Sequence, residues 1–110
     1  MRRFNEEASA AEVAIPIGEM FEICLGENPT AGYRWNLDSR GEPTCVLVNE
    51  YYTRGRESPG SQGIHHWNFR VVAPGTSTVE LTYRRHWQKV PPARTFRLEI
   101  HAGDGTTRGN

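Results

Sequence analysis

The sequence predicts an all-β domain, and three observations lead to that fold class. Apolar and polar residues alternate in short runs, as they do in strands that bury one face. Turn-forming residues separate these runs at intervals of about 8–15 residues, close to the spacing found in antiparallel folds. No stretch repeats apolar residues at the three- and four-residue spacing of a helix. The pattern is typical of an immunoglobulin-like β-sandwich of about seven strands.

The first half of the chain contains four alternating runs. The first includes Pro16, which indicates an edge strand because proline has no N–H to donate to a neighbouring strand. The turn Gly18-Glu19 separates it from the second run, and the breaker pair Asn28-Pro29 precedes the third. We expect Trp35 in the core, because a buried tryptophan on the third strand is typical of such sandwiches. The four strands are expected at residues 13–17, 20–25, 33–37 and 46–52.

The second half contains three more runs. A glycine-rich loop at residues 54–63 precedes the fifth strand, and a proline-glycine turn at residues 73–76 follows it. A second long loop, at residues 84–94, separates the last two strands. The strands are expected at residues 64–72, 79–83 and 96–100.

The whole chain, residues 1–110, is expected to form a single domain with its core between about residues 12 and 101. Residues 1–10 and 103–110 are polar and show no periodicity, so we expect both ends to be disordered. The chain as written shows no signal peptide, because carboxylates interrupt the place where an apolar segment should begin. A cytoplasmic location is therefore expected if the chain is full length.

Charge and size exclude several classes of function. A chain of 110 residues has no room for a second catalytic domain or a dinucleotide fold. Thirteen basic and thirteen acidic residues cancel, so the net charge favours neither nucleic acid nor an anionic membrane surface. No apolar run approaches the roughly 18–20 residues of a membrane-spanning helix. Residues 1–50 are acidic and residues 51–110 are basic; this asymmetry either forms a basic patch or disappears when the two halves interleave.

Residues that commonly carry catalysis form no recognisable constellation. His65 and His66 are adjacent on an expected strand, so their side chains point to opposite faces and cannot easily bind one metal ion. Cys24 lies in an alternating strand rather than at a helix N-terminus, where a thiol becomes reactive. With Cys45 it forms either two buried thiols or one disulfide. We expect that the protein is not an enzyme and binds no cofactor or metal. The weaker alternative is metal-dependent catalysis through His65 or His66 together with His86 or His101.

Two loops have a composition that an ordinary turn does not require. The first runs from Asn28 to Tyr33 and is stiff, because Pro29 fixes its own φ angle and Gly32 can adopt a positive φ. The second runs from Pro59 to Gly63, and its glycines allow the backbone of another chain to approach closely. Each is either a pre-shaped binding segment or a plain turn.

The third unusual loop follows the sixth strand. Continued alternation would place Arg85 and Trp87 toward the core, but arginine is a poor core residue. We therefore expect the strand to have ended and Trp87 to be exposed beside Arg85, a combination typical of interface hot spots. A core position for Trp87 is the alternative.

In this order the three loops resemble the signature of the chagasin family, small inhibitors of papain-like cysteine peptidases. That family shows Asn-Pro-Thr-Thr-Gly-Tyr, then Gly-x-Gly-Gly, then Arg-Pro-Trp. This sequence differs from the three motifs at Ala31, Gln62 and His86, and the similarity extends from about Val13 to Ile100. The corresponding residues are Asn28, Pro29, Thr30, Ala31, Gly32 and Tyr33 in the first loop, Gly60, Ser61, Gln62 and Gly63 in the second, and Arg85, His86 and Trp87 in the third.

The resemblance implies a monomeric inhibitor whose partner is a papain-like cysteine peptidase. The three loops would enter the peptidase cleft side by side, with Thr30 nearest the catalytic cysteine and histidine. Gly60 to Gly63 would follow the non-primed subsites, and Arg85 with Trp87 would lie on the primed side. Inhibition would be reversible and competitive, and the three departures favour lower affinity or altered selectivity. The alternative is a non-inhibitory adhesion or ligand-binding module that uses the same loop end, because the fold alone supports both.

Overall fold

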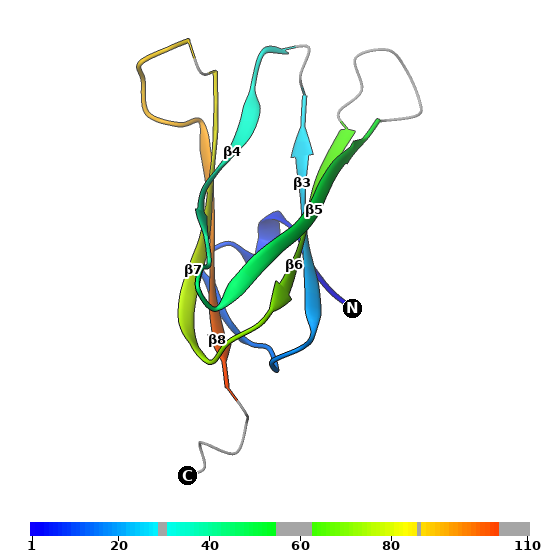
Figure 1. Ribbon diagram of the computed structural model, residues 1–110. Helices are drawn as coiled ribbons and strands as arrows, with labels where there is room; N and C mark the ends of the chain where they lie inside the picture. Colours follow the sequence, from blue (N-terminus) through cyan, green and yellow to red (C-terminus); the bar gives the residue numbers. More distant parts are fainter. Residues whose placement is uncertain (29–30, 55–62, 86, 104–110) are drawn as a thin grey trace.

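Two four-stranded sheets pack face to face in the computed structural model, which describes residues 1–28, 31–54, 63–85 and 87–103 (Figure 1). The strand orders are β1-β3-β6-β5 and β2-β8-β7-β4. The all-β sandwich is confirmed, with eight strands instead of about seven. Within the described residues no helix is long and apolar enough to span a membrane. The elements are β1 (Arg2–Phe4), the 3-10 helix η1 (Glu6–Ala8), β2 (Ala11–Ala14), β3 (Met20–Glu27), β4 (Arg34–Arg40), β5 (Cys45–Thr53), β6 (Gly63–Val71), β7 (Gly75–Arg84) and β8 (Arg94–Ala102).

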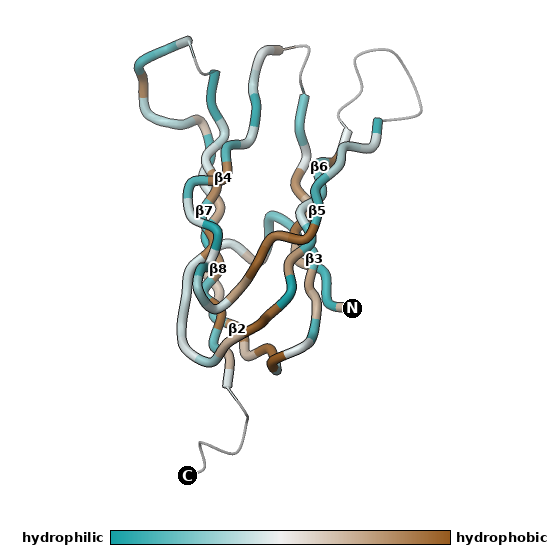
Figure 2. Tube along the Cα trace, viewed as in Figure 1, coloured by the Kyte–Doolittle hydropathy of each residue, from teal (hydrophilic) through white to brown (hydrophobic). Residues whose placement is uncertain are grey.

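The core lies between the sheets and is formed by the inward members of the alternating runs. Phe21 stacks on Phe69 with ring centroids 5.1 Å apart, and both rings are fully buried. Trp35 is only 6% exposed, which confirms its predicted place in the core. Hydrophobic segments lie in the body of the sandwich, whereas the strand ends at the loop-bearing end are mainly hydrophilic (Figure 2).

The N-terminal residues differ from the expected disorder. β1 pairs in parallel with β3, and β2 pairs in parallel with β8, so the first segment of the chain joins both sheets. The Phe4 ring packs edge-on against Phe21 at 6.1 Å, and a Glu6 carboxylate oxygen accepts a hydrogen bond from Gly26 N at 2.6 Å. These anchors are too few and too irregularly spaced to produce a periodic signal. Of the C-terminal segment expected to be disordered, residues 104–110 lie outside the described residues.

The first predicted strand is shifted. β2 does lie at the edge of its sheet, but it spans Ala11–Ala14, so Pro16 follows the strand instead of marking it. Ile15 is buried and donates its N–H to His101 O at 3.0 Å, whereas Ile17 is 42% exposed. The predicted turn at Gly18 is confirmed, and Gly18 adopts a φ of 98° that favours glycine.

Strand pairing brings three connections to one end of the sandwich (Figure 1). β3 and β6 are antiparallel, with Glu27 opposite Gly63, and β4 and β7 are antiparallel, with Arg34 opposite Arg84. The connections β3–β4, β5–β6 and β7–β8 therefore all leave from this end, which we call the loop end.

Candidate functional site

The first connection of the loop end, residues 28–33, is tied down on both sides. Trp35 N donates to a Glu27 carboxylate oxygen at 2.8 Å, and the Trp35 indole N–H donates to Gly26 O at 2.8 Å. Asn28 N donates to the Tyr83 hydroxyl at 3.0 Å. These bonds link the strand before the connection to the strand after it, so its two ends are held at a fixed separation.

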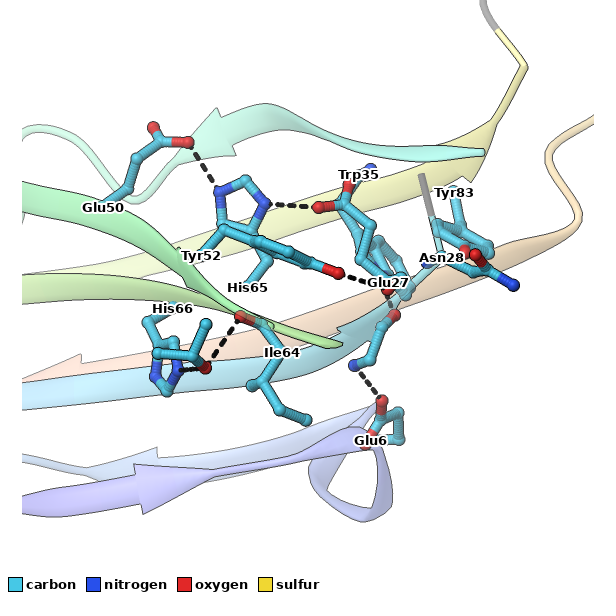
Figure 3. A network of polar contacts seen from close by, with 12 residues as sticks. Glu6, Glu27, Asn28, Trp35, Glu50, Tyr52, Ile64, His65, His66 and Tyr83 are labelled. Carbon is cyan, nitrogen blue, oxygen red and sulfur yellow. Dashed lines mark hydrogen bonds and ion pairs between the residues drawn. The ribbon is translucent and has the colours of Figure 1, made fainter. Parts of the chain in front are cut away.

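Glu27 is the buried centre of an ionic network at the base of this connection (Figure 3). Its side chain is 3% exposed, and one carboxylate oxygen lies 2.8 Å from His65 Nδ1. His65 Nε2 lies 2.8 Å from a Glu50 carboxylate oxygen. Both ring nitrogens of a histidine donate only when the ring is protonated. The geometry therefore favours a positively charged His65 between two carboxylates.

The pKa values of this network follow from competing effects. Burial alone would lower the pKa of His65, but hydrogen bonds and charges from Glu27 and Glu50 outweigh it and raise the pKa. Burial alone would raise the pKa of Glu27, but hydrogen bonds from His65 and from Trp35 N outweigh it and lower the pKa. Each group thus favours the charged form of the other.

The second connection of the loop end meets the first at Gly63. A Cβ atom at Gly63 would collide with the Tyr52 ring and with the Thr53 carbonyl, so only glycine fits between β3 and β5 here. The Tyr52 hydroxyl donates to Glu27 O at 3.3 Å (Figure 3). Glu27 therefore contacts the bases of both connections, through its carboxylate and through its carbonyl.

The third connection reaches the first through Arg85. β7 ends at Arg84, one residue beyond the predicted end and still before Arg85, and Arg85 Nε donates to Ala31 O at 2.9 Å. Its guanidinium lies over the Tyr33 ring, 4.5 Å from the centroid, where a cation–π attraction operates. Tyr33 in turn stacks on Tyr83 at 5.2 Å. One arginine thus fixes both a carbonyl and an aromatic ring of the first connection.

Trp87 adds a second contact between the same two connections. Its side chain is 61% exposed, which confirms the predicted exposed position. Gly32 has a φ of 85°, and a Cβ atom there would collide with the Trp87 ring. The indole therefore packs against a backbone position that only glycine allows, and most of its surface faces solvent.

Part of the predicted site can now be located. The structure brings the described members together at the loop end, with the first connection between the other two. The described members are Asn28, Ala31, Gly32, Tyr33, Gly63, Arg85 and Trp87. The members outside the described residues are Pro29, Thr30, Gly60, Ser61, Gln62 and His86.

Sequence reasoning missed the residues that hold the site in place. The predicted strand ends at residue 25, so the sequence assigns Glu27 to the loop that follows and gives no signal of its burial at the end of β3. Nothing in the sequence indicated its pairing with His65, which lies 38 residues away. Tyr83 is predicted only as a strand residue, and Tyr52 as a strand residue or, in a binding module, part of an aromatic platform; nothing in the sequence indicates that both hydroxyls bond to the backbone where β3 ends.

The two cysteines offer no nucleophile. Both are free thiols, so the disulfide alternative does not apply to this structure. Burial and the neighbouring Glu22 carboxylate raise the pKa of Cys24 to about 12, and burial raises the pKa of Cys45 to about 11. Each thiol therefore stays protonated near neutral pH. Because only the thiolate is nucleophilic, neither cysteine is suited to nucleophilic catalysis.

The motif order, the sandwich and the loop end agree with a family match over residues 14–100, to the chagasin family peptidase inhibitors, class I42. The chain belongs to the chagasin family. Relatives include chagasin of Trypanosoma cruzi, 33% identical over 84 residues that cover 72% of this chain and 76% of chagasin. Amoebiasin-1 of Entamoeba histolytica is 32% identical over 101 residues, covering 88% of this chain and 95% of that protein.

Solved structures support the same conclusion. The cysteine protease inhibitor EhICP2 of Entamoeba histolytica superimposes with a TM-score of 0.85 at 24% identity, covering 93% of this chain and 95% of that one, and shows the shared fold. The solution structure of Amebosin has a TM-score of 0.74 at 32% identity, covering 93% and 97%. Family membership confirms the predicted function: this chagasin-family protein is an inhibitor of papain-like cysteine peptidases and not an enzyme.

Proposed function

We propose that the protein blocks the substrate cleft of a papain-like cysteine peptidase with its loop end, reversibly and competitively. The observation that supports this most strongly is the position of the first connection, whose two ends are clamped by Trp35, Glu27 and Tyr83. A segment whose two ends are held in place loses less conformational entropy when it enters a cleft. This connection is therefore suited to act as the central wedge.

Contacts with the third connection strengthen this role. Arg85 holds Ala31 and Tyr33, and Trp87 covers Gly32. By resemblance to the family, Thr30 would lie nearest the catalytic cysteine and histidine, and Arg85 with Trp87 would contact the primed side. A large exposed indole beside an arginine is the composition expected of a binding hot spot.

The second connection would serve the non-primed side. Papain-like enzymes bind extended chains, and a glycine-containing segment can offer backbone hydrogen bonds without a clash of side chains. In this sequence Gln62 replaces a glycine of the family motif, and Ala31 replaces a threonine. If the absent threonine hydroxyl bonded to the enzyme, its loss costs about 1 kcal/mol of binding. We therefore expect inhibition to persist with lower affinity or altered selectivity.

Steady-state inhibition of papain and of a cathepsin L-type enzyme tests this proposal, with trypsin as the control. We expect competitive inhibition of both cysteine peptidases and none of trypsin. Excess inhibitor should also slow alkylation of the papain active-site cysteine by iodoacetamide, because the wedge covers it. A noncompetitive pattern, or alkylation at an undiminished rate in the inhibited complex, would contradict blockage of the cleft.

A further inference from the structure

A cluster of three different metal-ligating side chains lies on the outer face of the first sheet, away from the contacts described above. Cys24 and His66 are directly opposite each other on β3 and β6, and Glu22 lies two residues before Cys24, on the same face. His65, the neighbour of His66, points to the other side of the strand (Figure 3). The Glu22 side chain is 3% exposed and the His66 side chain is 16% exposed.

Each pair of these three residues brings two ligand atoms to the spacing found in tetrahedral metal sites. Cys24 Sγ lies 3.3 Å from a Glu22 carboxylate oxygen and 3.5 Å from His66 Nδ1. His66 Nδ1 lies 3.3 Å from the other Glu22 oxygen. Zinc binds sulfur at about 2.3 Å and nitrogen or oxygen at about 2.0–2.2 Å, which places ligands at tetrahedral corners about 3.3–3.6 Å apart. The sulfur and the imidazole nitrogen face different Glu22 oxygens, so each pair of residues is at this spacing, and one ligand atom from each of the three residues lies within 4.8 Å of the other two.

The hydrogen bonds around His66 leave the correct ring nitrogen available. The Thr53 hydroxyl donates its proton to Ile64 O at 3.4 Å, so its oxygen accepts from His66 Nε2, 2.9 Å away. In the neutral ring, Nδ1 then carries a lone pair directed at Cys24 and Glu22. Such an outer hydrogen bond is what orients histidine ligands at metal sites.

The remaining contacts hold Glu22 in place. Arg3 Nε donates to one carboxylate oxygen at 2.9 Å, and the Tyr51 hydroxyl donates to the other at 3.2 Å. The Tyr51 ring also stacks on His66, with centroids 4.3 Å apart and an interplanar angle of 6°. Within the cluster itself, the single thiol hydrogen of Cys24 lies between two acceptors. A cation that replaces this hydrogen would satisfy sulfur, nitrogen and oxygen together.

We propose that Glu22, Cys24 and His66 form a zinc-binding site, with a fourth position left for water or another ligand. A thiol, an imidazole and a carboxylate together suit Zn²⁺ or Co²⁺ rather than Mg²⁺ or Ca²⁺, which prefer oxygen ligands alone. Binding releases the Cys24 proton to solvent, and the sulfur binds as a thiolate. The described residues contain one other group of this kind, Glu12, Glu99 and His101, which has no thiol and serves as the control.

The test is a titration of the full chain with Co²⁺ in the presence of a phosphine reductant. We expect one equivalent to produce a sulfur-to-cobalt charge-transfer band and the strong visible bands of tetrahedral cobalt, and Zn²⁺ to abolish both by displacement. Zn²⁺ should also raise the thermal midpoint of the wild type.

Four variants assign the ligands. Cys24→Ala should remove the charge-transfer band, and both Cys24→Ala and His66→Gln should weaken Zn²⁺ binding by more than about 100-fold. Thr53→Val should weaken it by about 10–100-fold, the usual effect of losing an outer partner. The matched control His101→Gln should bind as the wild type does. Thermal midpoints measured in EDTA show that each variant is folded, and Thr53→Val takes the place of His66→Gln if the latter unfolds.

Three outcomes would overturn the proposal. The first is the absence of a sulfur-to-cobalt band in the wild type. The second is a band that survives in Cys24→Ala, which would place the thiolate at Cys45. The third is binding that His101→Gln abolishes and His66→Gln leaves unchanged. None of these results depends on inhibition of a peptidase, so the proposed function is tested separately.

Discussion

The base and the tip of the first connection are held by different kinds of contact. At the base, Glu27, Trp35 and Tyr83 are buried, and their hydrogen bonds join strands of both sheets. At the tip, Arg85 and the exposed Trp87 contact the segment from its solvent side. The difference separates two tasks: the base contributes to the stability of the sandwich, and the tip contributes to the shape and chemistry of the proposed binding surface.

The largest effect is expected at the base. Trp35→Ala removes a buried indole that bonds to Gly26 O and packs against Tyr83 with centroids 4.8 Å apart. We expect the free energy of unfolding to fall by about 3–5 kcal/mol, the usual cost of such a cavity. Urea unfolding followed by fluorescence measures it. A loss below about 1 kcal/mol would mean that the base does not support the fold as described.

Trp87→Ala, at the tip, should weaken inhibition and leave the stability of the fold nearly unchanged. We expect the inhibition constant to rise about 30-fold, equivalent to about 2 kcal/mol, with a nearly unchanged thermal midpoint. Ile17→Ala is the control, because Ile17 is an exposed apolar residue in the turn between β2 and β3, at the other end of β3 from the loop end. A collapse of the thermal midpoint in Trp87→Ala would erase the distinction between tip and base.

Arg85→Ala should have a smaller effect of the same kind. It removes a hydrogen bond to Ala31 O and a cation–π contact with Tyr33. We expect the binding free energy to weaken by about 1 kcal/mol, which corresponds to roughly a fivefold rise in the inhibition constant. Arg84→Ala controls for the loss of a positive charge next to it. Equal effects of the two substitutions would show that net charge, rather than the position of Arg85, matters.

The smallest effect is a pH dependence of the base. His65 has a pKa raised above its ordinary 6.5, so its contribution to stability is complete below about pH 6.5 and is lost as the pH rises through the raised value. Glu27 has a pKa lowered below its ordinary 4.5, so its contribution is present above about pH 4.5 and is lost as the pH falls through the lowered value. The network should therefore stabilise the fold most between about pH 4.5 and pH 6.5.

Thermal midpoints of the wild type and His65→Gln, measured across this range and above it, test the pH dependence. The difference between the two proteins should shrink as the pH rises through the pKa of His65, which NMR titration of the ring gives directly. A constant difference would show that the ring contributes through packing on Trp67, with centroids 4.1 Å apart, rather than through charge.

The sequence predicted the features that depend on local patterns. Alternation located the strands, and the poor fit of Arg85 to a core placed Trp87 in solvent. It could not predict the contacts between distant residues. Phe4 joins the fold through the short pairing of β1 with β3 and Glu6 through a single hydrogen bond to Gly26, and Glu27 meets His65 only because β3 pairs with β6. Strand geometry predicted that His65 and His66 point to opposite faces of the sheet. It did not predict which side chains each histidine contacts there.

The path of the N-terminal segment has a mechanical consequence. Within about a dozen residues the backbone crosses from β1 in one sheet to β2 in the other. The segment connects the two sheets covalently, so any sliding of one sheet against the other would stretch it. It also holds a carboxylate, Glu6, against Gly26, just below the wedge. The N-terminus is therefore a poor place for a fusion partner, because a load applied there would be transmitted to the base of the first connection.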